Sequence, residues 1–239
     1  MDLKESTLLH GRVAEHWYYC SKAKFVTRLL RDLRLRKILD IGAGSGFFTR
    51  WLMARRSVGE AWCVDLNYER DHDEQAHGGT IHFRRKLEPI DADLVLLMDV
   101  LEHVDDDVGL LRQAVEAAPV NATFLISVPA FQFMWSGHDV FLEHKRRYTL
   151  TQVETVTRAA GLRVREATYF FAGVFPVAML VRLPRKLLGL PVKAESGMHQ
   201  HSRLTNALLH ALSCAEIKLL RRNRWFGLTA CVVAERDAA

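Results

Sequence analysis

Short apolar runs alternate along the chain with stretches in which apolar residues recur at helical spacing. The apolar runs predict strands at residues 37–41, 61–65, 80–83, 93–99, 123–128, 163–170 and 228–234. The helical spacing predicts helices over residues 12–35, 47–55, 108–117, 151–160 and 204–220. Because strands that alternate with helices form βαβ units, the pattern predicts an α/β fold with a doubly wound parallel sheet. Right-handed crossovers then place the C-terminal ends of the parallel strands along one edge, where ligands bind.

The length of the chain favours one domain over residues 1–239, with additions at two places. Residues 1–35 form a helical entry segment, and residues 171–226 form an apolar, helical insertion that we expect to act as a lid. Its first part, 171–190, contains Arg182 after about a dozen apolar residues, whereas a membrane span needs about 20. A peripheral membrane contact through 171–190 is the alternative to a buried lid.

Charge and cysteine content add few constraints. The chain carries a net charge of about −5 up to His144 and about +10 from Lys145 onward, so the overall +5 belongs to its C-terminal part. A basic surface of this kind suits an anionic membrane, an acidic substrate or nucleic acid, and it is also an ordinary solvated surface. The four cysteines form no CxxC pair and no secretory leader is visible, so we expect a cytoplasmic, reduced protein.

Glycines at 42, 44 and 46 lie between the first predicted strand and the helix after it. Without side chains they permit a tight turn and a close approach of a ligand to the backbone and the helix N-terminus. A nicotinamide dinucleotide fingerprint would require glycine at position 47, which is Phe47. Asp65 ends the second strand, where a carboxylate can accept both hydroxyls of a ribose. The two features together suit an adenosine-type ligand.

Three motifs resemble those of the class I S-adenosylmethionine-dependent methyltransferases, in a bacterial subgroup that includes small-molecule and quinone enzymes. The segment Asp40–Gly46 resembles their first motif, Asp65 their ribose-binding acid, and Met98–Val104 their motif after the fourth strand. The resemblance implies a seven-stranded Rossmann-like sheet in the order 3-2-1-4-5-7-6, with strand seven antiparallel. It also implies S-adenosylmethionine as the cofactor.

The resemblance assigns cofactor-binding roles to nine residues. They are Asp40, Gly42, Ala43, Gly44 and Gly46 at the methionine end, Asp65 at the ribose, Leu66 on the adenine, and Asp99 and Val100 at the end of the fourth strand. The aromatic entry segment around Trp17 either caps the cofactor or docks its helix onto the core.

The segment that follows the fifth strand overhangs the ligand edge and supplies the candidate acceptor site. His138, His144 and His103 are candidate general bases for an oxygen acceptor, because imidazole titrates near neutral pH. Asp139 or Glu143 would orient an imidazole. The candidate acceptor-binding residues are Trp135, Asp139, Arg146, Arg147 and Tyr148. We expect no metal site, because the carboxylate run at 105–107 is typical of a helix cap.

These observations predict a methyltransferase that acts on a small or amphiphilic, lipid-like acceptor, with oxygen as the favoured methyl-accepting atom. The sequence leaves the oligomeric state open. Two alternatives remain at this point. One is a nucleic-acid methyltransferase that uses the basic C-terminal part, which we do not expect because basic and apolar residues are interleaved there. The other is a non-catalytic scaffold that binds the cofactor.

Overall fold

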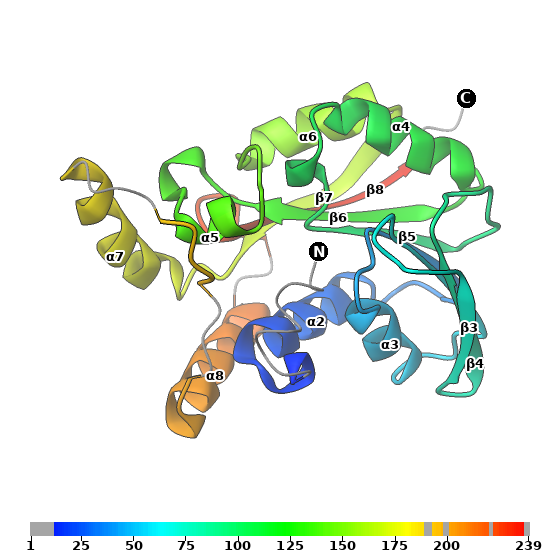
Figure 1. Ribbon diagram of the computed structural model, residues 1–239, viewed down its shortest axis with the longest axis horizontal. Coiled ribbons are helices and arrows are strands. Elements are labelled where there is room, and N and C mark those ends of the chain that lie inside the picture. The colour runs from blue at the N-terminus through cyan, green and yellow to red at the C-terminus, as the bar shows by residue number, and fades with distance from the viewer. Residues whose placement is uncertain (1–11, 189–192, 198–200, 220–221, 237–239) are drawn as a thin grey trace.

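A central sheet of eight strands organises the computed structural model, which describes residues 12–188, 193–197, 201–219 and 222–236 (Figure 1). The strands are β1 (Lys37–Ile41), β2 (Glu60–Val64), β3 (His72–Ala76), β4 (Gly79–Arg84), β5 (Leu94–Met98), β6 (Thr123–Pro129), β7 (Leu162–Phe170) and β8 (Thr229–Arg236). All seven predicted strands are present, and β3 is an addition.

The strand order is β3-β4-β2-β1-β5-β6-β8-β7. Strands β4, β2, β1, β5 and β6 are parallel, while β8 runs antiparallel to both β6 and β7. Counted without β3, this is the predicted order 3-2-1-4-5-7-6 with an antiparallel seventh strand, so the predicted fold class is confirmed. The switch in strand order lies between β1 and β5, whose C-terminal ends form the edge of the ligand site.

The additional strand β3 pairs antiparallel with β4 at the sheet edge. The residues of β3, His-Asp-Glu-Gln-Ala, lack the alternation of apolar and polar side chains that predicts a strand. None of them is fully buried. The two strands are joined by His77 and Gly78, which both have positive φ (52° and 80°). A two-residue hairpin turn requires this conformation, so the His-Gly pair was the local signal for the hairpin.

Helices cover both faces of the sheet (Figure 1). On one face lie α4 (Asp107–Ala117) and α6 (Leu150–Ala159); on the other lie α2 (Trp17–Leu29) and α3 (Phe47–Met53). The strands between them are almost completely buried, with β5 buried at every position. Three helical turns are short: η1 (Val13–Glu15), η2 (Leu101–His103) and η3 (Gln132–Met134). Residues of η2 and of the short helix α5 (Gly137–Phe141) line the cavity described below.

The described part of the insertion at 171–226 contains two helices, α7 (Phe175–Leu187) and α8 (Arg203–Leu219). Helix α8 packs beside α2, where Asn206 accepts a hydrogen bond from the backbone of Trp17 (2.8 Å) and His210 contacts Ser21 (2.9 Å). Residues 189–192, 198–200 and 220–221 of the insertion, and 1–11 of the entry segment, lie outside the described residues. Among the described residues, no helix is both long and apolar enough to cross a bilayer.

Candidate active site

The glycine turn after β1 adopts the backbone conformation that the sequence predicts. Gly42, Gly44 and Gly46 have φ values of 69°, 55° and 71°, in the left-handed region that favours glycine. A Cβ atom at Gly42 would lie 2.6 Å from Cγ2 of Val100, so the turn packs directly against the end of β5. Gly46 is the residue before α3, and the free N–H groups of that helix therefore face the ligand edge.

Asp65 fixes the shape of this turn from the end of β2. Its buried carboxylate accepts hydrogen bonds from the backbone N–H of Gly44 (3.0 Å) and from the backbone and side chain of Asn67 (2.9 and 3.0 Å). The Tyr68 hydroxyl donates to the Gly44 carbonyl at 2.7 Å. Leu66 presents an 81% exposed side chain beside this network. Asn67 and Tyr68 are therefore structural members of the site that the sequence did not reveal.

Asp40 is almost fully buried at the other side of the turn. It accepts a hydrogen bond from the Thr49 hydroxyl (2.8 Å), which ties the end of β1 to the first turn of α3. The structure therefore gives Asp40 a positioning contact that holds the glycine turn.

Asp99 has a left-handed backbone (φ 56°) at the end of β5. One carboxylate oxygen accepts a hydrogen bond from the Ser127 hydroxyl (2.9 Å), and the other pairs with the ammonium group of Lys22 on α2. The Lys22 side chain is completely buried. Burial alone would lower the pKa of Lys22, but the charge of Asp99 outweighs this effect and raises it. Lys22 is therefore charged at neutral pH and paired with Asp99.

A cavity of about 220 Å³ opens between the glycine turn and the segment after β6. Its lining includes four of the nine predicted cofactor residues, Asp40, Gly42, Ala43 and Asp99. The other five do not line it: Gly44, Gly46, Asp65, Leu66 and Val100. Trp17 and Tyr18 also line it, and their rings contact Phe171 (centroid distances 5.5 and 5.0 Å). The entry helix therefore both covers the cavity and docks onto the core.

A buried triad of side chains lies on the acceptor side of the cavity. The Asp139 carboxylate accepts hydrogen bonds from Nε and Nη2 of Arg147 (2.6 and 3.0 Å) and lies 2.9 Å from Nδ1 of His144. The Arg147 and His144 contacts help to hold the pKa of Asp139 well below its usual range, against the effect of burial. Both His144 and Arg147 line the cavity. Asp139 therefore orients the His144 ring, and Arg147 compensates the negative charge of Asp139.

Glu102 also lines the cavity, although the sequence analysis did not select it. Its side chain is fully buried on η2, and neither carboxylate oxygen has a hydrogen-bond partner among the described residues. Burial, with the nearby charge of Asp99, raises the pKa of Glu102 well above its usual range. The signal in the sequence was its place next to His103, three residues after Asp99.

His138 lines the same cavity from α5. Its Nδ1 atom accepts a hydrogen bond from the backbone N–H of Gly197 (3.0 Å), so the neutral ring carries its proton on Nε2. Burial lowers the pKa of His138 to about 4, and the ring is therefore neutral at physiological pH. In this tautomer Nε2 of His138 can donate a hydrogen bond to the molecule that accepts the methyl group.

Other candidates lie outside the cavity lining. Arg146 contacts Asp107 and the carbonyls of Val104 and Asp105, and the Tyr148 hydroxyl donates to Asp107 (2.7 Å) beneath η2. Trp135 is half-buried and Glu143 is exposed. A residue that the sequence did not select, Arg182 of α7, lines the cavity in their place.

Comparison with known proteins places this fold and cavity in a family. A family model described as a methyltransferase domain matches residues 14–167, which is more than half of the chain. The chain belongs to this methyltransferase family. A search of curated protein sequences finds no match.

Solved structures with low sequence identity share the fold of this methyltransferase. A chain from the complex between the Haloferax volcanii Trm112 methyltransferase activator and a methyltransferase is 16% identical, with a TM-score of 0.58 and coverage of 100% of this chain and 97% of that one. The [4+2]-cyclase SpnF is 13% identical (TM-score 0.56, coverage 93% and 83%). An S-adenosylmethionine-dependent methyltransferase from Clostridium acetobutylicum is 10% identical (TM-score 0.52, coverage 92% of both chains). The presence of a cyclase among them illustrates that this fold alone does not identify the second substrate.

The methyltransferase uses S-adenosylmethionine, and its described residues fit this cofactor. The left-handed glycine turn and the carboxylate of Asp65 one strand away provide a close backbone approach and an acid for a ribose. The cavity begins at the same turn and continues to the acceptor side, where Glu102, His138 and His144 lie. The roles of the individual side chains toward the cofactor remain predictions.

Proposed function

We propose that the methyltransferase transfers its methyl group to an oxygen of an amphiphilic acceptor that carries an anionic group. The observation behind this proposal is that one cavity joins the glycine turn to Glu102, His138 and His144 and to the guanidinium group of Arg182. When bound, S-adenosylmethionine supplies an activated methyl group on a sulfonium, so the protein has mainly to align the acceptor. Glu102 and His144 line the cavity, and His103 lies next to them outside the lining. This group of three, the polar wall, is where an acceptor hydroxyl would meet polar groups.

Arg182 supports the proposed anionic group on the acceptor. Arg147 is already used by Asp139, whereas Arg182 has one partner among the described residues, the Met134 carbonyl at 3.1 Å. Burial, with the nearby charge of Arg147, lowers the pKa of Arg182 to about 10, against the opposing effect of Asp139. A guanidinium group with free N–H donors in a partly desolvated cavity favours a carboxylate or phosphate.

The outer surface of the insertion supports an amphiphilic acceptor. Helix α7 directs Arg182 into the cavity, while Val177, Leu180 and Val181 of the same helix are exposed. Leu204, Leu208 and Leu212 form a second exposed row at helical spacing on α8. We propose that these two rows contact the cytoplasmic surface of a membrane, from which the acceptor enters the cavity. A peripheral contact of this kind needs only an apolar helix face and nearby positive charge.

The proposal is tested with labelled S-adenosylmethionine and a panel of hydroxylated amphiphiles, each offered with an anionic group and as its neutral analogue. The expected result is transfer to the oxygen of anionic members, with Arg182→Gln raising their KM about 10- to 100-fold, the range for a lost charge-assisted hydrogen bond. The exposed Arg158→Gln on α6 is the matched control and leaves KM unchanged. Equal use of anionic and neutral acceptors by the wild-type protein, or transfer only to nitrogen or carbon, contradicts the proposal.

A further inference from the structure

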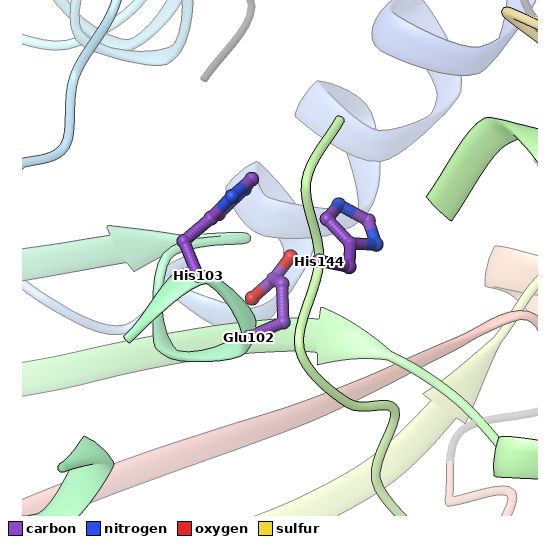
Figure 2. A group of neighbouring side chains, drawn as sticks. All are labelled: Glu102, His103 and His144. Carbon is purple, nitrogen blue, oxygen red and sulfur yellow. The ribbon is translucent and has the colours of Figure 1, made fainter. Parts of the chain in front are cut away.

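Three side chains in the polar wall have the composition of a transition-metal site. Glu102 and His103 come from η2, and His144 comes from the segment after α5 (Figure 2). One potential ligand atom from each residue lies within 4.8 Å of the other two. Figure 2 shows the carboxylate of Glu102 and the two imidazole rings gathered at one place beside the ligand edge. Two imidazoles and one carboxylate are a common donor set for zinc and for iron(II).

The burial of Glu102 points independently to a missing ligand. Buried carboxylate oxygens almost always have hydrogen-bond partners, because removing them from water without a partner costs several kcal/mol. Both oxygens of Glu102 are buried without such a partner among the described residues. Nε2 of His144 is also buried without a hydrogen-bond partner among the described residues. A cation between these atoms would satisfy all three.

The opposite side of the His144 ring is built to support a ligand role. Its Nδ1 atom lies 2.9 Å from Asp139, which also contacts Arg147 and the backbone and hydroxyl group of Ser136. A carboxylate on one ring nitrogen fixes the tautomer that leaves the other nitrogen free, and it makes that nitrogen a better donor to a metal. Asp139 is completely buried, so this orientation is held by packing as well.

The charges around the wall leave room for a cation. Lys22 is paired with Asp99, and Arg147 is paired with Asp139. Each pair is neutral as a whole, and Glu102 forms no ion pair among the residues described. A divalent ion bound there would supply the positive charge that favours its ionised form.

We propose that Glu102, His103 and His144 bind a divalent transition-metal cation at the acceptor side of the cavity. The three residues leave coordination positions open, as catalytic sites do. This role in catalysis rests on the proposed function. An acceptor hydroxyl bound to the cation would lose its proton to water more easily. The oxygen lone pair then forms the bond to the methyl carbon while the carbon–sulfur electron pair returns to sulfur, which yields a methyl ether and S-adenosylhomocysteine.

Binding is tested on the chain of residues 1–239. It is first treated with a chelator and then titrated with Co²⁺, whose visible absorption reports coordination by nitrogen and oxygen. We expect about one Co²⁺ per chain, displaced by Zn²⁺, and at least about tenfold weaker binding in Glu102→Gln and His144→Gln. His77→Asn is the matched control, because His77 is exposed in the β3–β4 turn and asparagine tolerates its positive φ. It should bind Co²⁺ like the wild-type protein.

Calorimetric titration with S-adenosylhomocysteine shows which variants remain folded. The proposal is overturned if the wild-type protein binds no Co²⁺, or if folded Glu102→Gln and His144→Gln bind it as tightly as His77→Asn. The metal ion has no role in catalysis if chelator-treated protein methylates the acceptor at an undiminished rate. That outcome leaves the proposed function intact. Tight Co²⁺ binding without transfer to any oxygen acceptor contradicts the proposed function and leaves the metal site intact.

Discussion

Replacing Lys22 with methionine tests whether a buried ion pair holds the entry helix against the cofactor site. Methionine has nearly the shape of lysine but no charge, so Lys22→Met leaves Asp99 without its cationic partner. The Asp99 side chain is only 14% exposed and keeps one hydrogen bond, from Ser127. Breaking a buried pair on one side costs about 3–5 kcal/mol, and the retained bond places this variant near the lower value. We therefore expect a loss of about 3 kcal/mol in the free energy of unfolding.

A double-mutant cycle separates the pair from each residue's other contacts. Asp99→Asn suits the second variant, because asparagine tolerates the left-handed backbone at this position and can still accept a hydrogen bond from Ser127. It leaves the Lys22 charge buried, and we expect a similar loss. In Lys22→Met/Asp99→Asn neither charge remains, so the double variant should lose about 1–2 kcal/mol, less than either single variant.

Urea unfolding at neutral pH, followed by circular dichroism, measures all four free energies. The raised pKa of Lys22 means that the contribution of the Lys22 charge is fully present up to about pH 10.5 and declines only above it, so neutral pH is suitable. Additive losses, to within about 0.5 kcal/mol, would refute the inference that the two charges stabilise each other.

Four further outcomes follow from the same structure. Gly42→Ala should abolish binding of S-adenosylhomocysteine in calorimetry, because the added Cβ would meet Val100. The control Gly161→Ala should bind normally, since Gly161 also has a positive φ but no neighbour within 4 Å, and equal affinities would contradict the packing argument. Asp65→Ala should weaken that binding by about 1–3 kcal/mol, with the exposed Asp73→Ala as control, and unchanged affinity would contradict a ribose contact. Burial raises the pKa of Cys231 to about 12, and Cys63 is also buried, so at pH 8 a thiol reagent should modify only Cys20 and Cys214 in the native protein. Rapid reaction of all four cysteines would contradict the burial of Cys63 and Cys231. Leu180→Glu/Leu208→Glu should reduce sedimentation with anionic phospholipid vesicles at least about tenfold while Val120→Glu, exposed elsewhere, should not.

The sheet could be predicted from the sequence because its central strands are buried on both faces. Continuous apolar runs such as β5 are distinctive, and the order of the strands followed from the family resemblance. Strand β3 was missed because an edge strand needs no apolar side chains, and its hydrogen bonds to β4 are made by the backbone. Its prediction required the turn, where His77 takes a conformation that is uncommon for residues other than glycine.

The site could be predicted in part because sequence shows the type of a residue and not its direction. Arg146 and Arg147 are neighbours in one run of basic residues, yet Arg147 points into the cavity while Arg146 binds carbonyls beneath η2. Glu102 was missed for a related reason. A glutamate is usually exposed, and only the tertiary structure shows that this one is buried without a hydrogen-bond partner among the described residues.

The cavity contains charges of two kinds, and their difference suggests how an acceptor enters. Lys22 with Asp99 and Arg147 with Asp139 are compensated pairs that hold the walls in place. Glu102 on η2 and Arg182 on α7 form no ion pair among the residues described, and both line the cavity. Each therefore favours a ligand group of opposite sign. An amphiphile bound with its anion at Arg182 would place its hydroxyl toward the wall of Glu102, His103 and His144. Since α7 also carries the exposed apolar row, the apolar part of that molecule would remain at the outer surface while its oxygen reaches the methyl group.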